Sequence, residues 1–433
     1  MWTTASPAGF TCVVRYLYLD FPLDLSFFAR GKQAAYTYSY AHMKESIHIK
    51  NFGPLRDVRI DDIKPLTVLI GDSASGKSAL MKVIALMRYI YKKVNIRAYL
   101  KNSHISKTPF RLRFDSLLHD GMKEMLTPET EIEYIVTCLG ERRYEITYKE
   151  KLNANIGVEN EDLLFFKEAF VAETRSLVPM WYTRGASIRG DLGFLFHETF
   201  NDFFQAVDRI KEQPLNYIDM KMQVVKGPWR KELFVVPNDG HHKPIKLHHA
   251  SSGIQTSAPL MTIMRYFANE FSFSAAFRRS VLDTLTDDNI TKFRPEVNSE
   301  DLKKFVHLHI EEPELSLDPK TQCLFINDLI REAFYRGDNK RPDDGRQLGL
   351  MFATHSPYIL NHLNVLLKAS YYEKARERYP YIKPEEIAAY RMDDGEVEPL
   401  MAIDNKTEHH VINTIDLSET MEDIFDDYVS INE

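Results

Sequence analysis

The sequence has few cysteines and no long apolar run. Only Cys12, Cys138 and Cys323 occur among 433 residues. Their odd number and wide spacing argue against a disulfide framework and fit a reducing cytosol. No segment approaches the roughly 18 consecutive apolar residues of a membrane-spanning helix, so we expect no membrane insertion. An excess of positive charge is also missing: the net charge of −7 and the pI near 6.1 are unlike those of a protein that coats nucleic acid.

A secretory signal is missing as well. Charges at Arg15, Asp20 and Asp24 interrupt the aromatic-rich segment GFTCVVRYLYLDFPLDLSFFARGK, and no cleavage site follows it. Strand-like alternation begins at Met43, in MKESIHIKNFGPLRDVRI. We therefore expect the functional core to start at Met43, with residues 1–42 as an accessory segment or an over-long reading frame.

What the sequence does contain is an alternation of buried strands and helices. Strands are expected at 45–51, 65–70, 221–225, 232–237, 305–310 and 348–353, and helices at 77–94, about 194–212, 257–271 and 320–335. Continuous apolar strands between helices predict an α/β fold whose mostly parallel sheet is covered on both faces. The alternating runs TEIEYIVTCL and RRYEITYKEK predict an additional antiparallel β segment.

A glycine-rich loop follows the strand expected at 65–70. GDSASGKS (71–78) fits G-x-x-x-x-G-K-[ST], with a strand before it and a helix beginning inside it. The backbone N–H groups would surround phosphates, Lys77 would reach the β- and γ-phosphates, and the Ser78 hydroxyl would join a Mg²⁺ shell. The chain is therefore expected to bind a nucleoside triphosphate. The expected contacts are Gly71, Asp72, Ser73, Ala74, Ser75, Gly76, Lys77, Ser78 and Ala79.

Two acidic residues follow the apolar strand in FVHLHIEEPELSLDP (305–319). Ligands of open α/β sheets bind at such strand ends. Glu311 would hold Mg²⁺, directly or through water, and Glu312 would polarise the attacking water. His307 and His309 share one face of the strand. Because no cysteine or carboxylate at ligand spacing joins them, we expect core histidines and no metal pair.

The strand expected at 348–353 also ends in a polar group. In LGLMFATHSPYIL, His355 stands at the strand's tip, where an imidazole can hydrogen-bond a γ-phosphate and sense its loss. We expect Lys77, Glu312 and His355 to be the catalytic residues.

The stretch HHASSGIQTSAPLM (248–261) is by itself a serine-rich turn before a helix. Its place between the glycine-rich loop and the acid pair completes an order of motifs that resembles ABC-type ATPase heads. The resemblance is to the branch that contains SMC proteins, RecF-like repair proteins and OLD-family ATPases. It covers about residues 44–90 and 246–365, and IHIKNFGPLRD looks like the first strand and adenine-side loop of that branch.

The resemblance implies roles for further residues. The implied motifs are Walker A (Gly71–Ser78), signature (Ser251–Gln255), Walker B (Glu311, Glu312), D-loop (Leu317, Asp318) and H-loop (His355). Ser252, Gly253, Gln255 and Asp318 would contact nucleotide. The resemblance also implies ATP and Mg²⁺ as cofactors. Two chains would pair head to head around two Mg-ATP, with Ser252 and Gly253 of one chain capping the ATP of the other.

The sequence departs from the family pattern at several points. Ile254 replaces the second glycine of the usual Leu-Ser-Gly-Gly-Gln, and Glu-Glu replaces Asp-Glu, a pattern associated with the OLD-like, defence-associated subset. No Gln occurs between Gln33 and Gln205, so no Q-loop is placed. VAETRS (171–176) resembles a short arm-lobe motif of this subset and makes Arg175 a functional candidate.

The middle and the end of the chain separate the members of this branch. The segment between Ser78 and Ser251 lacks sustained heptads, which excludes a long SMC-type coiled coil and favours a compact lobe. After His355, RMDDGEVE supplies Asp393 and Asp394 but no Asp-x-Asp, which argues against a built-in Toprim nuclease. We therefore expect an effector on another polypeptide, such as a nuclease.

Two charged segments each allow two interpretations. Residues 82–113 contain Lys82, Arg88, Lys92, Lys93, Arg97, Lys101, Lys107, Arg111 and Arg113 and no acid. This is either a solvated helix face or a contact surface for the phosphates of DNA or RNA. In the tail, Ile415, Leu417, Met421, Ile424 and Phe425 have approximate helical spacing, which fits either a partner-docking segment or a simple acidic helix.

Taken together, the sequence predicts a P-loop NTPase of the ABC-type ATPase head class, with an antiparallel β segment and a helical arm lobe. The expected segments are an extension (1–42), the Walker A half of the core (43–90), the β segment and arm lobe (91–245), the second core half (246–370) and a C-terminal segment (371–433). The function expected is an ATP-hydrolysing switch for a separate effector, in bacterial antiphage defence of the Septu or PARIS kind. A RecF-like DNA repair ATPase and an ATP-locked scaffold that restrains a toxic partner are the alternatives.

Overall fold

The computed structural model describes residues 43–105, 110–184, 193–227, 231–336, 341–414, 426–427 and 429–430. The expectations for residues 1–42, for Lys107 and for the apolar residues of the tail lie outside these ranges. Among the described residues, no helix combines the length and apolarity needed to span a bilayer.

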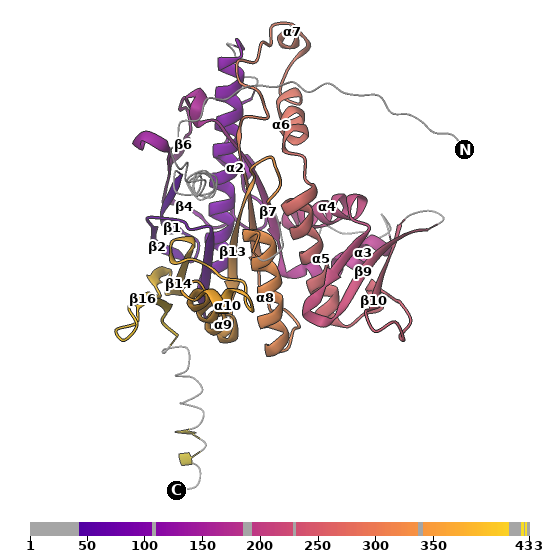
Figure 1. Cartoon of the computed structure of the whole chain (residues 1–433). Coiled ribbons are helices and arrows are strands. Elements are labelled where there is room, and N and C mark those ends of the chain that lie inside the picture. Colours follow the sequence, from indigo (N-terminus) through magenta and orange to yellow (C-terminus); the bar gives the residue numbers. More distant parts are fainter. Residues whose placement is uncertain are drawn as a thin grey trace, which may run out of the picture. The chain divides into compact units, whose positions relative to one another are not determined.

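One large sheet organises the described chain (Figure 1). Its strands, in spatial order, are β6 (Lys151–Asn153), β5 (Arg143–Lys149), β4 (Leu126–Thr137), β1 (Lys44–Phe52), β2 (Leu55–Ile60), β15 (Glu396–Pro399), β14 (Ile387–Asp393), β3 (Leu66–Gly71), β13 (Gln347–Thr354), β12 (Lys303–Glu311) and β7 (Leu164–Val171). The block β14-β3-β13-β12-β7 is parallel throughout, and the block β6-β5-β4-β1-β2 is antiparallel. The expected α/β class and the antiparallel segment are confirmed.

Helices cover the parallel block. The described helices, only some of which pack on this block, are α2 (Lys77–Asn102), α3 (Val178–Arg184), α4 (Phe194–Arg209), α5 (Ser252–Arg265), α6 (Phe273–Leu282), α7 (Asp287–Ile290), α8 (Pro319–Phe334), α9 (Pro357–Ala369) and α10 (Glu373–Arg376). Helix α2 packs along β7, β12, β13 and β3, α4 packs on β7, and α8 packs on β13. Strands β3, β12 and β13 are apolar and buried because helices lie against them, as continuous apolar runs predict.

A smaller antiparallel sheet lies on the other side of the parallel block from β1, β2 and β4 (Figure 1). It contains β8 (Glu212–Leu215), β9 (Met220–Lys226), β10 (Lys231–Pro237) and β11 (Ile245–Lys246), and a separate pair joins β16 (Met401–Ile403) to β17 (His410–Ile412). With α3 and α4 it occupies the range expected for an arm lobe. Strand β7 comes from the same range yet joins the core sheet. The expected domain boundaries stay a prediction.

Some elements extend beyond their predicted limits. Helix α2 continues to Asn102 instead of ending at 94, because its later turns still bury apolar residues such as Ile96 and Leu100. Helix α5 begins at Ser252, although 257 was expected, and continues into a π-helical turn at Tyr266–Glu270. Pro259 lies in the interior of α5, although proline in helices is found mostly in the first turn.

Candidate nucleotide site at the carboxyl edge of the sheet

The five parallel strands end at one edge of the sheet. Register pairs Ile70 with Thr354, Glu311 with Ala353, and Ile310 with Val171. The segments that follow β3, β12, β13 and β7 therefore emerge side by side. These segments are the glycine-rich loop, the acid pair, His355 and the Arg175 segment, so the topology brings the predicted site residues of three motifs together.

The glycine-rich loop leaves β3 and enters α2. A Cβ on Gly71 would lie 2.3 Å from the carbonyl oxygen of Met392 in β14, so only glycine fits where the loop passes this neighbouring strand. Gly76 caps α2 with φ 101°, and a Cβ there would lie 2.8 Å from Leu55. Asp72, Ser73 and Ala74 are exposed, as is Ser78 in the first turn of α2.

Lys77 is buried inside the curve of this loop. Its Nζ donates to the carbonyl oxygens of Gly71 (2.8 Å) and Asp72 (2.7 Å). Burial lowers the pKa of Lys77, while the negative charges of Asp72, Glu312 and Glu314 act in the opposite direction. The ammonium is thus within electrostatic reach of the acidic residues that follow β12.

The acid pair stands where β12 ends. The Glu311 carboxylate accepts a hydrogen bond from the Glu173 backbone N–H at 3.3 Å. Glu312 has φ 44°, its N–H donates to the Ala353 carbonyl, and its carboxylate lies 4.0 Å from Nε2 of His355. The two glutamates therefore have different surroundings, which suits the different roles expected of them.

The surroundings of Glu312 suit it to act as a general base. Burial raises its pKa above the usual value, and the charges of Glu314 and Glu173 add to the increase, against His355 and Arg175. A carboxylate with a raised pKa holds a proton more strongly, so it is a better acceptor for the proton of an attacking water at neutral pH.

A third carboxylate, Glu314, fixes the position of His355. Its Oε1 accepts from the Thr354 hydroxyl (2.7 Å) and from the His355 backbone N–H (2.8 Å). The sequence analysis missed Glu314, although its spacing after the acid pair, in Glu-Glu-Pro-Glu, is the signal that could have indicated it. Glu173 was missed as well, because nothing in the sequence indicates that β7 lies beside β12.

Arg175 connects three segments around the site. It is fully buried in a short 3₁₀ turn, η5 (Glu173–Leu177). Its guanidinium donates to the backbone carbonyls of Ala172 (3.2 Å), Glu311 (2.6 Å), Glu312 and Thr256 (3.3 Å). Burial lowers the pKa of Arg175 to about 10, against the attraction of nearby glutamates. The guanidinium thus joins the acid pair to the first turns of α5.

The serine-rich stretch forms the beginning of α5. Ser251 is the N-cap residue, and both Ser251 and Ser252 are exposed. Gly253 is buried: a Cβ there would lie 2.7 Å from the carbonyl oxygen of Ser316. The Gln255 side chain donates to the Ala250 carbonyl at 2.7 Å. The stretch is therefore packed against the turn after β12, with its two serines open to solvent.

That turn is also tied to the segment of His355. Asp318 is exposed and caps α8, accepting from the backbone N–H groups of Lys320 and Thr321. Gln322 donates to the Leu317 carbonyl (2.9 Å) and accepts from the Ser356 hydroxyl (2.6 Å). Asp318 thus has a structural function as a helix cap in addition to the predicted nucleotide contact.

The comparisons with known proteins bear on this arrangement. Residues 43–176 match the family model described as the AAA ATPase domain. This part of the chain is similar to AAA ATPase domains. The match includes the Walker A loop, α2 and Arg175, and it confirms the resemblance to an ATPase head.

Several solved structures are also similar to this chain. An SMC head domain from Thermotoga maritima is 13% identical with a TM-score of 0.35, and covers 83% of this chain and 100% of its own. A RecF structure with ATP has 13% identity, a TM-score of 0.32 and coverage of 83% and 99%. A dimeric bacterial ABC transporter cassette has 12% identity, a TM-score of 0.29 and coverage of 81% and 96%.

The groups present at this site fit a magnesium ion. Within the described ranges, no group of three or more His, Cys, Asp or Glu side chains could hold a metal by itself. Mg²⁺ does not require one, because it binds through one or two carboxylates together with phosphates and water. The Glu311 carboxylate and the exposed Ser78 hydroxyl are ligands of this kind.

The basic residues of 82–113 have different surroundings. Arg88 is buried and makes a bidentate ion pair with Glu45 at 2.7 and 3.0 Å. The ammonium of Lys92 lies 4.6 Å from the centre of the Phe165 ring, and burial lowers the pKa of Lys92 to about 7. Of the described basic residues in this stretch, Lys101, Arg111 and Arg113 are exposed. The long helix α2 faces the core on several sides, so its charges divide between interior and surface.

The two histidines of β12 also differ in part from expectation. His307 and His309 are core histidines as predicted, but a carboxylate does join them. Glu168 in β7 accepts from His307 Nδ1 and His309 Nε2, both at 2.9 Å. This acid lies on a neighbouring strand, and so sequence spacing could not show it.

Proposed function

We propose that this chain hydrolyses ATP, with two copies paired head to head around two Mg-ATP. The observation that carries the proposal is the position of Glu312. Its carboxylate has a raised pKa and lies beside His355, at the sheet edge where the Lys77 loop emerges. A base, an imidazole and a phosphate-binding loop at one edge are the parts that ATP hydrolysis requires.

In this mechanism the chain's own residues position the water and the phosphates. Glu312 accepts a hydrogen bond from the water that attacks the γ-phosphorus and takes its proton as the bond to ADP breaks. Lys77 and the loop N–H groups neutralise charge on the phosphates. His355, held by Glu314, hydrogen-bonds the γ-phosphate. Bound Mg²⁺, held by Ser78 and Glu311, would supply further charge neutralisation.

Pairing of two chains is supported by the beginning of α5. Ser251 and Ser252 are exposed at the N-terminus of a 14-residue helix, where backbone N–H groups favour an anion. The same surface includes the turn that carries Asp318, since Gly253 packs on Ser316. A partner's γ-phosphate docked there would couple its hydrolysis to the contact between the chains.

The test uses Glu312→Gln to keep ATP unhydrolysed. This variant with Mg-ATP is expected to run as a dimer in light scattering, whereas the same chain with ADP is expected to run as a monomer. Adding Ser252→Arg should abolish the dimer but leave binding of a fluorescent ATP analogue within about twofold, because Ser252 of one chain serves the partner's nucleotide. Ala275→Arg, exposed on α6, is the matched control and should leave the dimer intact. A dimer that survives Ser252→Arg would refute capping in trans.

The biological role proposed is control of a separate effector, such as a nuclease, in antiphage defence within the bacterial cytoplasm. It rests on the resemblance to OLD-like and to Septu- and PARIS-type ATPases. Co-purification of the native complex followed by nuclease assays tests it, as does phage plating with the wild type and Glu312→Gln. The DNA-repair alternative would use the basic residues of 82–113 that remain at the surface, among them Lys101, Arg111 and Arg113, and strong stimulation of ATP hydrolysis by DNA ends or gaps without any partner would favour it. An ATP-locked scaffold would be indicated by equal turnover in the wild type and Glu312→Gln.

A further inference from the structure

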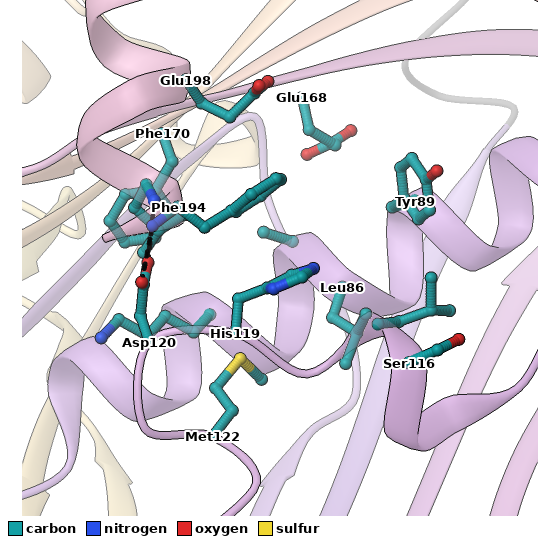
Figure 2. Close-up of a pocket in the computed structure, with 14 residues that line it drawn as sticks. Leu86, Tyr89, Ser116, His119, Asp120, Met122, Glu168, Phe170, Phe194 and Glu198 are labelled. Atoms are coloured by element: carbon teal, nitrogen blue, oxygen red, sulfur yellow. Dashed lines mark hydrogen bonds between the residues drawn. The ribbon is translucent and has the colours of Figure 1, made fainter. Parts of the chain in front are cut away.

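A cavity of about 380 Å³ lies beside the Walker A helix (Figure 2). Its walls come from α2, from η2 (Phe114–Leu117) and the segment after it, from β7 and from the first turns of α4. The carboxyl end of β7 continues into the turn of Arg175, and α2 begins at Lys77. The cavity therefore touches two elements that also contribute to the nucleotide site, although the glycine-rich loop, the acid pair, His355 and Arg175 do not line it.

Aromatic rings form much of the cavity wall. His119 stacks on Phe194 with ring centroids 4.2 Å apart and planes at 17°. Tyr89 from α2 and Phe170 from β7 also line the space (Figure 2). The faces of such rings carry negative charge density and attract cations within about 6 Å.

The charged groups that face the cavity are predominantly acidic. They are Glu168, Glu198 and Asp120, with Lys82 as the one cation among its described lining residues. Asp120 is occupied, because it accepts from the backbone N–H groups of Phe194 and Leu195 at 2.8 Å each. Glu168 is held in place by its two histidines, and their attraction and that of Arg88 outweigh burial and keep its pKa far below the usual range.

Glu198 is the lining carboxylate that can still accept hydrogen bonds from a ligand. No hydrogen bond to it is found within the described ranges, although Lys92 and Lys167 lie near enough to interact with its charge. A half-buried carboxylate that accepts no hydrogen bond is stabilised by a ligand that donates one.

We propose that this cavity binds a small organic cation, an alkylammonium or guanidinium compound, whose charge lies against Glu198 and Glu168 and whose body packs on the Phe194 and Tyr89 rings. An anion would meet two carboxylates, and a neutral apolar ligand would leave Glu198 without a donor. The proposal does not depend on ATP hydrolysis, so its test is made without nucleotide.

The test is calorimetric titration of the full chain with agmatine, which carries both a guanidinium and an ammonium group, and separately with spermidine. The wild type is expected to bind at least one of them. Glu198→Gln should weaken that binding about tenfold, because it removes the charge and keeps the shape. Phe194→Leu should weaken it about fivefold, since it keeps apolar volume and loses the ring face. Glu145→Gln, an exposed acid on β5, is the matched control and should bind as the wild type does.

Thermal unfolding of each variant identifies any that fails to fold. Phe194→Leu and Glu198→Gln test the ring face and the charge separately, so the proposal can still be tested if one of them does not fold. If the wild type binds neither ligand at concentrations up to about 10 mM, the proposal is overturned, because a specific pocket would bind with a lower dissociation constant than this. Equal binding by the wild type, Glu198→Gln and Phe194→Leu would overturn it too, since it would show attraction to the acidic surface as a whole.

Discussion

Arg175 offers the sharpest test of how the nucleotide site is held together. Its guanidinium is fully buried and donates to four backbone carbonyls, on η5, on the acid pair and on α5. Arg175→Met keeps much of the side-chain volume and removes every donor. The carbonyls of Glu311, Glu312 and Thr256 then lose this partner where water has little access. We expect both stability and turnover to fall.

The size of the stability loss follows from two opposing contributions. Hydrogen bonds from a charged group contribute about 1.5 kcal/mol each, so four contribute about 6 kcal/mol. Burial outweighs the attraction of the nearby glutamates and lowers the pKa of Arg175 to about 10, which corresponds to a net cost of about 3 kcal/mol for holding the cation in this environment. Arg175→Met removes both, and we expect the free energy of unfolding to fall by about 3 kcal/mol.

Turnover should fall further than folding alone explains. The Glu311 and Glu312 carbonyls set the direction of the acid pair, and a displacement of about 1 Å costs on the order of a hundredfold in rate. We expect ATPase activity per folded molecule to drop about tenfold or more. Arg175→Lys should be nearly as inactive, because one ammonium cannot reach carbonyls on both Thr256 and Glu312.

The assay pairs urea unfolding with steady-state ATP hydrolysis well below the variant's Tm. Arg346→Met is the matched control: Arg346 is also buried and donates to a backbone carbonyl, that of Phe267, but it precedes β13 at the opposite edge of the sheet. That variant should lose stability and keep its activity per folded molecule. If Arg175→Met hydrolyses ATP within twofold of the wild type once corrected for folding, the reasoning is wrong.

Two further predictions concern the carboxylates. Because the folded-state pKa of Glu312 is raised, its ionised form destabilises the fold, and this penalty is present above the folded pKa and disappears as the pH falls through it. Glu312→Gln should therefore be inactive yet more resistant to urea at pH 7. The difference in the free energy of unfolding between this variant and the wild type should shrink towards pH 4.5, and a less stable variant at pH 7 would contradict the argument. Glu314→Gln keeps an acceptor for Thr354 and His355 but removes a charge that raises the Glu312 pKa, so the acid limb of the kcat profile should move to lower pH. Glu314→Ala, which frees His355, should lose most activity at every pH, and an unmoved profile in Glu314→Gln would show that the two acids do not interact.

The sequence alone predicted those parts of the site that depend on local order. A strand, a glycine-rich loop and a helix are contiguous around Lys77, and so are a strand and the acid pair at Glu311. Units of this kind can be recognised from the pattern of residues that are close together in the sequence. The same holds for His355 at the end of its strand. In the structure all three lie at the carboxyl ends of β3, β12 and β13, because these strands are parallel.

What the sequence could not predict depends on which strands are neighbours. Strand β14 begins far along the chain at Ile387, yet it pairs with β3 and brings Met392 against Gly71. The hydrogen bonds of Arg175 go to backbone carbonyls, and every residue has a carbonyl, so no residue pattern indicates its partners. The division of the basic stretch between interior and surface could not be predicted for a similar reason: composition counts charges, whereas burial of Arg88 depends on Glu45 in β1.

Register provides the physical link between the buried histidines and the nucleotide site. In the pairing of β7 with β12, His307 is opposite Glu168, and both histidines of β12 donate to that carboxylate. A slip of one residue would turn Glu168 to the other face of the sheet and leave an unpaired charge in the interior. The buried acid therefore favours one register of a strand that is remote in sequence. That register sets where β7 ends, and it places Arg175 against the carbonyls of Glu311 and Glu312. A polar group that takes no part in the chemistry thus helps to determine the geometry of the residues that do.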